Sequence, residues 1–359
     1  MDSFKLISLD TRMATDEDAN LDTYDHTKLS NINTCPTWGI LRYSLHKKMP
    51  GASRSMALEA GGAAHEAFSA VRLFQYKHYQ CHTDAARANS DMHGIRLFGE
   101  DRYNRIESVL SSSATERTNC INYAIEALES CEFYDDIGDS RRTISNISES
   151  LISFVDSYDM ERYPLWIRDS KDPTTDIGIE IAFDIVVTIK YELNGIHDVL
   201  MVRFTGKLDG LHWDGDQLII IEEKTGAKLD DHWLSQWILS HQITGYCIAS
   251  STFTNEPCLK AIASGMRIPI GKIPAEGIRR EVCNRSQHMF DKWCNWFVTS
   301  VLMEQQWRDN VVQAPMYTHS CNRYFSTCTY LPFCAADSFE EKLSIIEEME
   351  DDEWSPLHE

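Results

Sequence analysis

Two carboxylates and a lysine flank a predicted strand pair, and these residue types could support metal-dependent chemistry. The stretch 204–226 carries Asp209 before a turn signal and Glu222, Glu223 and Lys224 after an apolar run. Side chains alternate between the two faces of a strand, so Glu222 and Lys224 share one face. Paired carboxylates on a largely apolar face are costly unless a cation neutralises them. Their oxygens suit Mg²⁺ or Mn²⁺, with Lys224 placed to orient water or stabilise developing negative charge.

The pairing of the two strands depends on the turn between them. Asp214-Gly215 predicts a two-residue hairpin loop, because both central positions of such a turn need positive φ. With that loop, Asp209 lies opposite Ile220, on the face of the second carboxylate and the lysine. The alternative is a solvated strand pair with weak ion pairs. The three isoleucines at 219–221 favour a buried strand and therefore a site.

The elements around the hairpin follow from hydrophobic periodicity. Helical spacing covers 27–48, 52–79, 101–163 with breaks near 111–113 and 135–140, 232–250 and 285–308. Alternating, β-branched segments predict strands at 177–191, 199–213, 217–225, 259–270 and 277–283. This order of elements predicts a mixed α+β fold, with a small mixed sheet flanked by helices and a helical N-terminal insertion.

The spacing of the charged residues resembles a known family. Asp209 followed by Glu222-Glu223-Lys224 is similar to the D…(D/E)xK core of the PD-(D/E)XK nucleases, and the run EKTG resembles their RecB-like branch. The run Gly61–Glu66 resembles that branch's upstream helix, with His65 as the counterpart of its metal-binding histidine.

Two further matches lie in the same order along the chain. Gln242 and Tyr246 match a QxxxY pattern on the helix after the strands, one turn apart on one face. Glu180 is a further candidate, as the acidic residue of the preceding strand. Together the matches extend from Ser30 to Cys334, whereas each motif taken singly is weak.

The resemblance implies a restriction-endonuclease-like core and a division of labour among these residues. His65, Asp209, Glu222 and the Glu223 carbonyl would hold one or two divalent ions. Asp209, Glu222 and Lys224 would act in catalysis, and Gln242 and Tyr246 would position the DNA strand. The implied activity is a DNA exonuclease acting at ends in recombination, repair or phage DNA metabolism. The alternatives are a structure-specific endonuclease or nuclease subunit of a larger complex, and a non-catalytic DNA-end-binding protein.

Four of the eleven cysteines form a second pattern. Cys35 comes early, and Cys321, Cys328 and Cys334 follow late with C-x6-C-x5-C spacing. The resemblance implies a 4Fe-4S cluster, as in the iron-sulphur subset of this family, although that subset often shows a shorter first gap. Structural Zn²⁺ fits the same four thiolates, and four unligated thiols remain the alternative. The other seven cysteines show no ligand spacing.

The net charge of −21 is concentrated at the chain ends. Residues 1–25 carry −5 and residues 337–359 carry −9, which leaves −7 for the region between. The ends therefore predict an acidic N-terminal arm, 1–25, and an acidic C-terminal tail, 337–359, solvated or docking onto a basic partner or mimicking DNA. Candidates for a local basic groove are Arg42, Lys47, Lys48, Arg54, Arg72, Arg203, Lys207 and Lys228.

Between the ends, residues 26–336 predict a single nuclease domain. Its expected parts are a helical part at 26–165, the catalytic sheet and helices at 176–310, and a cysteine segment at 315–336. No apolar run approaches the ~20 residues that cross a bilayer, and no leader pattern opens the chain. We therefore expect a cytoplasmic protein whose partner is DNA, with no membrane and a possible protein partner at the acidic tail.

Overall fold

The structure is a computed structural model that describes residues 4–51, 56–131, 141–158, 161–169, 176–268, 277–323, 326–353 and 355. The chain divides into two compact units. Unit 1 comprises 1–53, 182–206 and 286–359, and unit 2 comprises 54–181 and 207–285. Among the described residues, no helix is long and apolar enough to cross a membrane.

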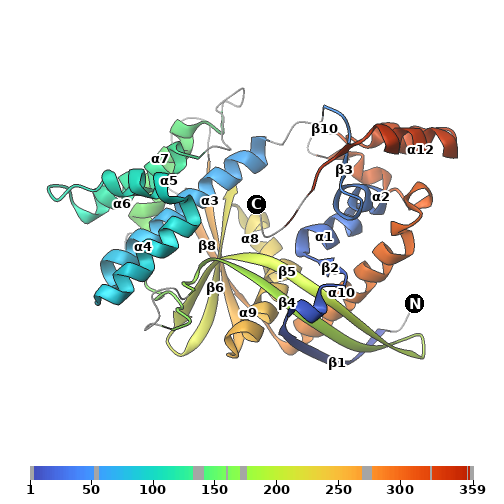
Figure 1. The fold of residues 1–359 in the computed structure, drawn as a ribbon, viewed down its shortest axis with the longest axis horizontal. Coiled ribbons are helices and arrows are strands. Elements are labelled where there is room, and N and C mark those ends of the chain that lie inside the picture. The colour runs from blue at the N-terminus through green and yellow to red at the C-terminus, as the bar shows by residue number, and fades with distance from the viewer. Residues whose placement is uncertain are drawn as a thin grey trace. The chain divides into compact units, whose positions relative to one another are not determined.

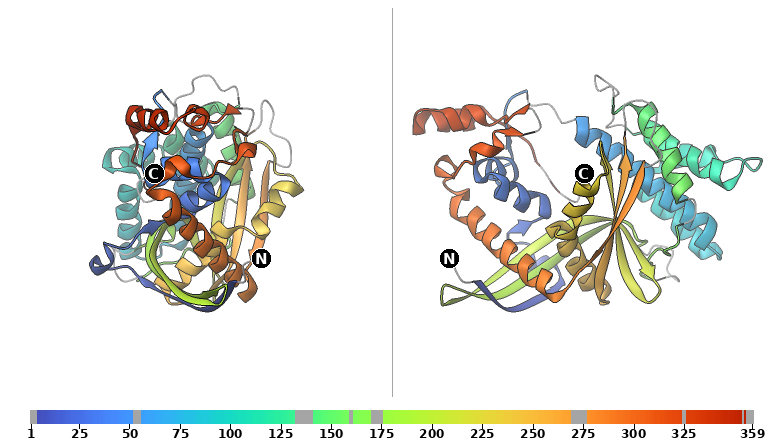
Figure 2. Two further views of the ribbon diagram at one scale, coloured as in Figure 1. Left: turned by 90° about the vertical axis from the view of Figure 1, so that its right-hand side faces the viewer. Right: turned by 180° about the vertical axis from the view of Figure 1, so that it is seen from behind.

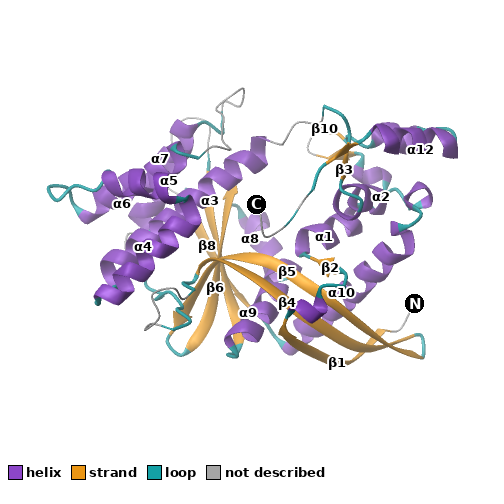
Figure 3. Cartoon of the chain, viewed as in Figure 1, coloured by secondary structure: helices purple, strands orange, loops and turns teal. Residues whose placement is uncertain are grey.

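A mixed seven-stranded sheet provides the framework, in the order β1-β4-β5-β6-β7-β8, with β2 pairing β5 (Figure 3). β5 and β6 are antiparallel, β6 and β7 are parallel, and β7 and β8 are antiparallel. β4 and β5 contribute residues to both units. The strands are β1 (Phe4–Met13), β2 (Thr23–Tyr24), β4 (Ile179–Leu193), β5 (Ile196–Asp214), β6 (Gln217–Gly226), β7 (Cys258–Arg267) and β8 (Ile278–Asn284).

Unit 2 packs two groups of helices against β6, β7 and β8. α9 contacts β7 and α8 contacts β8, whereas α3 contacts β6 and α7 contacts both β7 and β8. Figures 1 and 2 show these groups on different sides of the strands. The helices are α3 (Met56–Gln75), α4 (Asp84–Phe98), α5 (Glu100–Ser108), α6 (Glu116–Glu129), α7 (Ile144–Ser157), α8 (Asp231–Ile238) and α9 (His241–Thr254), with a π turn at Tyr76–Gln80.

Unit 1 is built around the long helix α10. Its Trp293 and Phe297 form an aromatic core with Tyr24 and Phe204. The helices are α1 (His26–Thr34), α2 (Pro36–Gly39), α10 (Gln287–Arg308), α11 (Leu331–Ala335) and α12 (Phe339–Glu348). Short strands are β3 (Lys47–Lys48), β9 (Asn322–Arg323), β10 (Ser326–Thr327) and β11 (Glu350–Asp351), and short 3₁₀ or π turns lie at Asp16–Asp18, Ile40–Ser44, Val311–Gln313 and Thr318–Ser320.

The predicted mixed α+β class is confirmed, while two predicted helices are interrupted. The helix expected at 27–48 breaks at Cys35, because Pro36 opens α2. The helix expected at 232–250 is two helices, since Ser240 caps α9 by accepting the Ile243 N–H. Helix α4 was not predicted. The expected break at 135–140 and strand end at 269–270 lie outside the described residues.

Both acidic ends contain regular structure. The segment expected as an N-terminal arm supplies β1, which pairs with β4 and so joins the main sheet. The C-terminal tail, expected to be solvated, contains α12 and β11. Ile345, Ile346 and Met349 pack there against a core cluster that includes Tyr330 and Phe333. The apolar positions of the tail thus have a partner that its composition does not reveal.

Candidate active site

The hairpin of β5 and β6 brings the two motif carboxylates together, in a register that differs from the prediction. The loop is Gly215-Asp216 rather than Asp214-Gly215, and Asp214 pairs with Gln217. Only Gly215 of these residues has a left-handed backbone, with φ of 62°. The register is shifted by two residues, which preserves the faces of the strands. The predicted shared face of the charged residues therefore survives an error in the turn.

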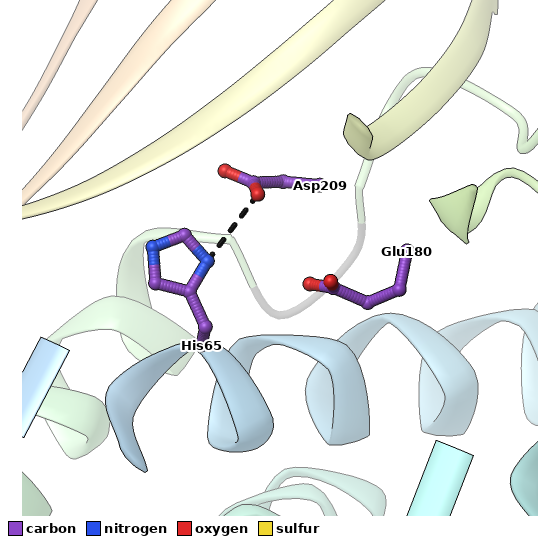
Figure 4. A group of neighbouring side chains, drawn as sticks. All are labelled: His65, Glu180 and Asp209. Atoms are coloured by element: carbon purple, nitrogen blue, oxygen red, sulfur yellow. Dashed lines mark ion pairs between the residues drawn. The ribbon is translucent and has the colours of Figure 1, made fainter. Parts of the chain in front are cut away.

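Helix α3 supplies a histidine beside this hairpin (Figure 4). His65 Nδ1 lies 3.3 Å from Asp209 Oδ1. Gly61, four residues before the histidine, lies near the end of β6, where a Cβ on it would make an ordinary van der Waals contact with Thr225. His65 is half-buried and Asp209 is nearly buried. The structure thus joins two motifs that are far apart in the sequence.

Glu180 completes a compact group of potential metal ligands. One ligand atom from each of His65, Glu180 and Asp209 lies within 4.8 Å of the others. Ser69 Oγ donates to Glu180 Oε1 at 3.0 Å, and Lys207 Nζ lies 3.0 Å from Glu180 Oε2. Glu180 has a φ of 50° within β4, a strained value for a non-glycine residue.

The sequence motifs named Glu180 only as a further candidate and missed Ser69. Ser69 follows His65 by four residues in α3, and a hydroxyl at that interval shares the histidine's face. That interval is the signal that could have found it. The unusual backbone of Glu180 has no counterpart in the local sequence.

Glu222 lies at the centre of a second set of contacts. Lys224 Nζ is 2.5 Å and Gln242 Nε2 is 3.0 Å from Glu222 Oε1. Gln242 Nε2 also lies 3.1 Å from the Tyr246 hydroxyl. Glu222 Oε2 is buried and has no hydrogen-bond partner among the described residues. A buried carboxylate oxygen without a donor is costly, and a bound cation would remove that cost.

The charges in this group shift one another's pKa values. Burial raises the pKa of Glu222 to about 7, and the Asp209 carboxylate adds to the rise. Burial would lower the pKa of His65, but the Asp209 carboxylate outweighs it and raises that pKa to about 9. Burial disfavours ionised Asp209, yet His65 and Lys224 hold its pKa well below the usual range. Two cations thus partly neutralise the carboxylates.

The Glu223 side chain is engaged elsewhere, within a buried network. Its carboxylate pairs with Arg72 of α3, whose guanidinium also contacts His212 Nε2 and lies 3.4 Å from the Ile221 carbonyl. His212 Nδ1 lies 2.8 Å from the Tyr163 carbonyl. The Glu223 side chain therefore does not join the metal group, which leaves only its backbone for the proposed ligand role.

The backbone of Glu223 still touches the site. Its N–H donates to Asp209 Oδ2 at 2.7 Å, so β6 orients the carboxylate through the main chain. Arg72, one of the candidates for a basic groove, is 5 % exposed and cannot serve a surface role. Its guanidinium passes over Gly210, where a Cβ would lie 1.7 Å from Arg72 Nη1.

Several other groove candidates are also paired. Arg203 pairs with Asp184, and Lys207 pairs with Glu180. Lys228 is exposed, and Arg54 lies outside the described residues. Arg42, Lys47, Lys48 and Arg203 belong to unit 1, whereas Arg72, Lys207 and Lys228 belong to unit 2. A local basic groove stays a prediction.

The four candidate cluster cysteines lie near one another in unit 1. Ser320 Oγ donates to the Thr34 carbonyl at 2.8 Å, which joins the neighbours of Cys321 and Cys35. The Cys328 N–H donates to the Cys321 carbonyl at 2.8 Å. Burial raises the pKa of Cys334 to about 11, and the other three thiols add to the rise.

Comparisons with known proteins identify the family of the chain. A family model described as the PD-(D/E)XK nuclease superfamily matches residues 26–335. No curated protein matches the chain. A solved structure titled "Crystal structure of SSO0001" is 14% identical, with a TM-score of 0.26, over 66% of this chain and 95% of that one. The family match spans most of the sequence, including the hairpin, His65 and the four candidate cluster cysteines, and the chain therefore belongs to the PD-(D/E)XK nuclease superfamily.

Proposed function

We propose that this protein is a divalent-metal-dependent DNA exonuclease of the RecB-like branch, hydrolysing phosphodiester bonds from DNA ends. Recombination, repair or phage DNA metabolism would be its setting. The observation that carries the proposal is the group His65, Glu180 and Asp209, whose ligand atoms lie within 4.8 Å of one another. The unpartnered Glu222 Oε2 beside it is a second oxygen that suits a hard cation.

These four side chains would hold Mg²⁺ or Mn²⁺, with the Glu223 carbonyl as a further ligand. The ion would supply Lewis acidity to the phosphodiester and to the attacking water. His65 must lose a proton before its nitrogen can bind a cation, because its pKa is raised to about 9. Metal binding would therefore release protons near neutral pH.

The remaining polar residues would act on the substrate. Lys224, held 2.5 Å from Glu222, stays protonated and can stabilise negative charge on a phosphate oxygen. Gln242 bridges Glu222 and the Tyr246 hydroxyl, so a DNA strand contacting α9 would be oriented relative to the carboxylates.

The same site residues are also compatible with two alternative functions. A structure-specific endonuclease, or the nuclease subunit of a larger complex, would use the same group on a different substrate. A non-catalytic DNA-end-binding protein is disfavoured, because Glu222 and Asp209 are buried at a cost that binding alone does not require.

Cleavage of matched substrates distinguishes these activities. The full chain is incubated with end-labelled linear DNA and with closed circular DNA, in Mg²⁺, Mn²⁺ or EDTA. We expect loss of linear DNA from its ends in either metal, with circular DNA intact and no cleavage in EDTA. Cutting of circular DNA would establish the endonuclease, and binding of ends without cleavage would establish the non-catalytic protein.

We further propose that Cys35, Cys321, Cys328 and Cys334 hold a 4Fe-4S cluster, with structural Zn²⁺ as the alternative. Burial raises the pKa of Cys328 and Cys334, with a contribution from the neighbouring thiols, and a bound metal would offset this cost by stabilising the thiolates. The first and last of these residues are far apart in the sequence, so the centre would join the N-terminal helices to the C-terminal segment of unit 1.

Metal analysis and colour test this assignment. Anaerobically purified protein should be brown and lose its broad absorbance on oxidation, whereas colourless protein with stoichiometric zinc would select zinc. Cys35→Ser should lower both metal content and the melting temperature. Cys120→Ser, at a buried thiol of unit 2, should leave the metal content unchanged. Protein without iron or zinc, together with a stable Cys35→Ser variant, would refute the proposal.

A further inference from the structure

The acidic end of the chain pairs with one of its few basic segments. β11 (Glu350–Asp351) runs antiparallel to β3 (Lys47–Lys48). Lys47 Nζ lies 2.5 Å from Asp351 Oδ1, and Lys48 Nζ lies 3.3 Å from Glu350 Oε2. Figure 1 shows β3 near α12, the helix that precedes β11. Consecutive acidic residues thus meet consecutive lysines.

A third pair extends the same contact. The Arg42 guanidinium binds the Asp352 carboxylate and also donates to the Asp352 carbonyl at 3.1 Å. The Asp352 N–H donates to the His46 carbonyl at 2.7 Å. Three successive acidic residues, 350–352, therefore cover three cationic side chains in a chain of net charge −21.

Residues 350–352, which we call the tip, make electrostatic contacts, whereas the residue before them packs in an apolar core. Glu350 and Asp351 side chains are 50% and 79% exposed, and such surface ion pairs contribute about 0–1 kcal/mol each and weaken with salt. Met349, immediately before them, is 5 % exposed within the core cluster of unit 1. Release of residues 350–352 would therefore leave the buried packing of Met349 unchanged.

Tethering compensates for the weakness of these pairs. A segment joined to its binding surface by a short linker acts at an effective concentration on the order of mM. The tip then occupies the cations most of the time, yet a ligand with several negative charges could displace it. Nucleic acid is such a ligand, since Lys and Arg bind its phosphates and release counterions.

We propose that Arg42, Lys47 and Lys48 form a binding surface for the phosphate backbone of nucleic acid, and that residues 350–352 mask this surface as an intramolecular competitor. The inference rests on the proposed nuclease function and adds to it a regulated contact with the substrate. A C-terminal anchor with no ligand would show the same ion pairs, but it would respond differently to neutralisation of the acidic residues.

The first test compares two full-length variants that lose the same charge. One is Glu350→Gln, Asp351→Asn, Asp352→Asn, which removes the acidic partners. The control is Glu340→Gln, Glu347→Gln, Glu348→Gln, whose exposed carboxylates lie on α12. Binding of a fluorescent single-stranded and a duplex DNA is measured in EDTA across a salt series, with melting temperatures alongside.

The neutralised tip should bind DNA several-fold more tightly at low salt. The slope of log affinity against log salt concentration should become more negative by about 2 to 3, because each phosphate neutralised by a cation contributes roughly 0.7 to 0.9 and three cations become available. The control should keep the wild-type slope. An equal gain in the control would show a general charge effect and overturn the masking. No gain in a variant that melts like wild type would also overturn it.

The second test removes the lysines. Lys47→Gln with Lys48→Gln should cancel the gain when combined with the neutralised tip, and should change wild-type binding little. A gain that persists without the lysines would place the phosphate contacts elsewhere and overturn the proposal. Metal-dependent cleavage by the wild type is measured in parallel. If the protein cleaves DNA but neutralising the tip does not tighten DNA binding through the lysines, the masking alone is refuted. If neutralising the tip tightens binding through the lysines but the protein does not cleave DNA, the nuclease function alone is refuted.

Discussion

Removal of Arg72 tests how the active site is held together. Arg72 and Glu223 are 5 % and 2 % exposed and form a buried ion pair between α3 and β6. Arg72→Met fills much of the same volume but leaves the Glu223 carboxylate buried without its partner. Breaking a buried pair in this way costs about 3–5 kcal/mol. We therefore expect the free energy of unfolding to fall by that amount.

A matched set of variants separates this cost from simple loss of contacts. Replacing both partners, as Arg72→Met with Glu223→Leu, should recover most of the stability, because neither charge of the pair is left buried without its partner. Arg279→Met breaks an ion pair with Asp231, which is 94% exposed, and should cost about 0–1 kcal/mol. Urea unfolding of the full chain measures all three.

A substitution at Gly210 provides an independent test of the Arg72–Glu223 ion pair. A Cβ there would lie 1.7 Å from Arg72 Nη1, so Gly210→Ala should displace the guanidinium and reproduce much of the loss. Gly62→Ala, in α3 with nothing within 4 Å of its Cβ, should instead stabilise by about 0.5–1 kcal/mol. An Arg72→Met variant that loses less than about 1 kcal/mol would refute the buried-pair reasoning.

The same pair should also affect metal binding. Arg72 lies on the helix that carries His65, and Glu223 donates its N–H to Asp209. Arg72→Met should therefore raise the Mg²⁺ concentration for half-maximal cleavage. Unchanged metal dependence in a folded variant would show that the pair stabilises the fold without positioning the ligands.

Three further predictions concern the site itself. Asp209→Asn and Lys224→Ala should each reduce metal-dependent cleavage by at least about 100-fold while the far-ultraviolet spectrum stays unchanged; full activity in either would refute the assignment. His65→Ala should raise the metal requirement or change the preference between Mg²⁺ and Mn²⁺, and identical titrations would leave it as a helix residue. In EDTA, the folded state holds the Glu222 proton more tightly than the unfolded chain, because its pKa rises from 4.5 to about 7. The free energy of unfolding should therefore fall as pH rises through that interval, and Glu222→Gln should flatten the fall; identical pH profiles would refute it.

The local sequence predicted strand β6 and the faces of the hairpin. The three isoleucines before Glu222 lie buried in β6, and alternation placed Asp209, Glu222 and Lys224 together even though the turn was wrong. An error of two residues leaves the faces unchanged because the side-chain period of a strand is two. These features depend on neighbours along the chain, so one sequence was enough to predict them.

Other features depend on partners distant in the sequence. The burial of Arg72 follows from Glu223, His212 and the bare backbone at Gly210, which no local pattern reveals. The tail appeared solvated because its composition is acidic. Its apolar residues have a core to pack against only once α12 packs against the other helices of unit 1.

The metal group shows the same division. The family resemblance indicated His65 and Asp209 and named Glu180 as a further candidate, but only the structure brings ligand atoms of all three within 4.8 Å of one another. Alternation and turn residues act over a few positions and can be read from the chain. Distances between side chains depend on which helices and strands pack together, because burial and electrostatic pairing act through space, and only the tertiary structure decides them.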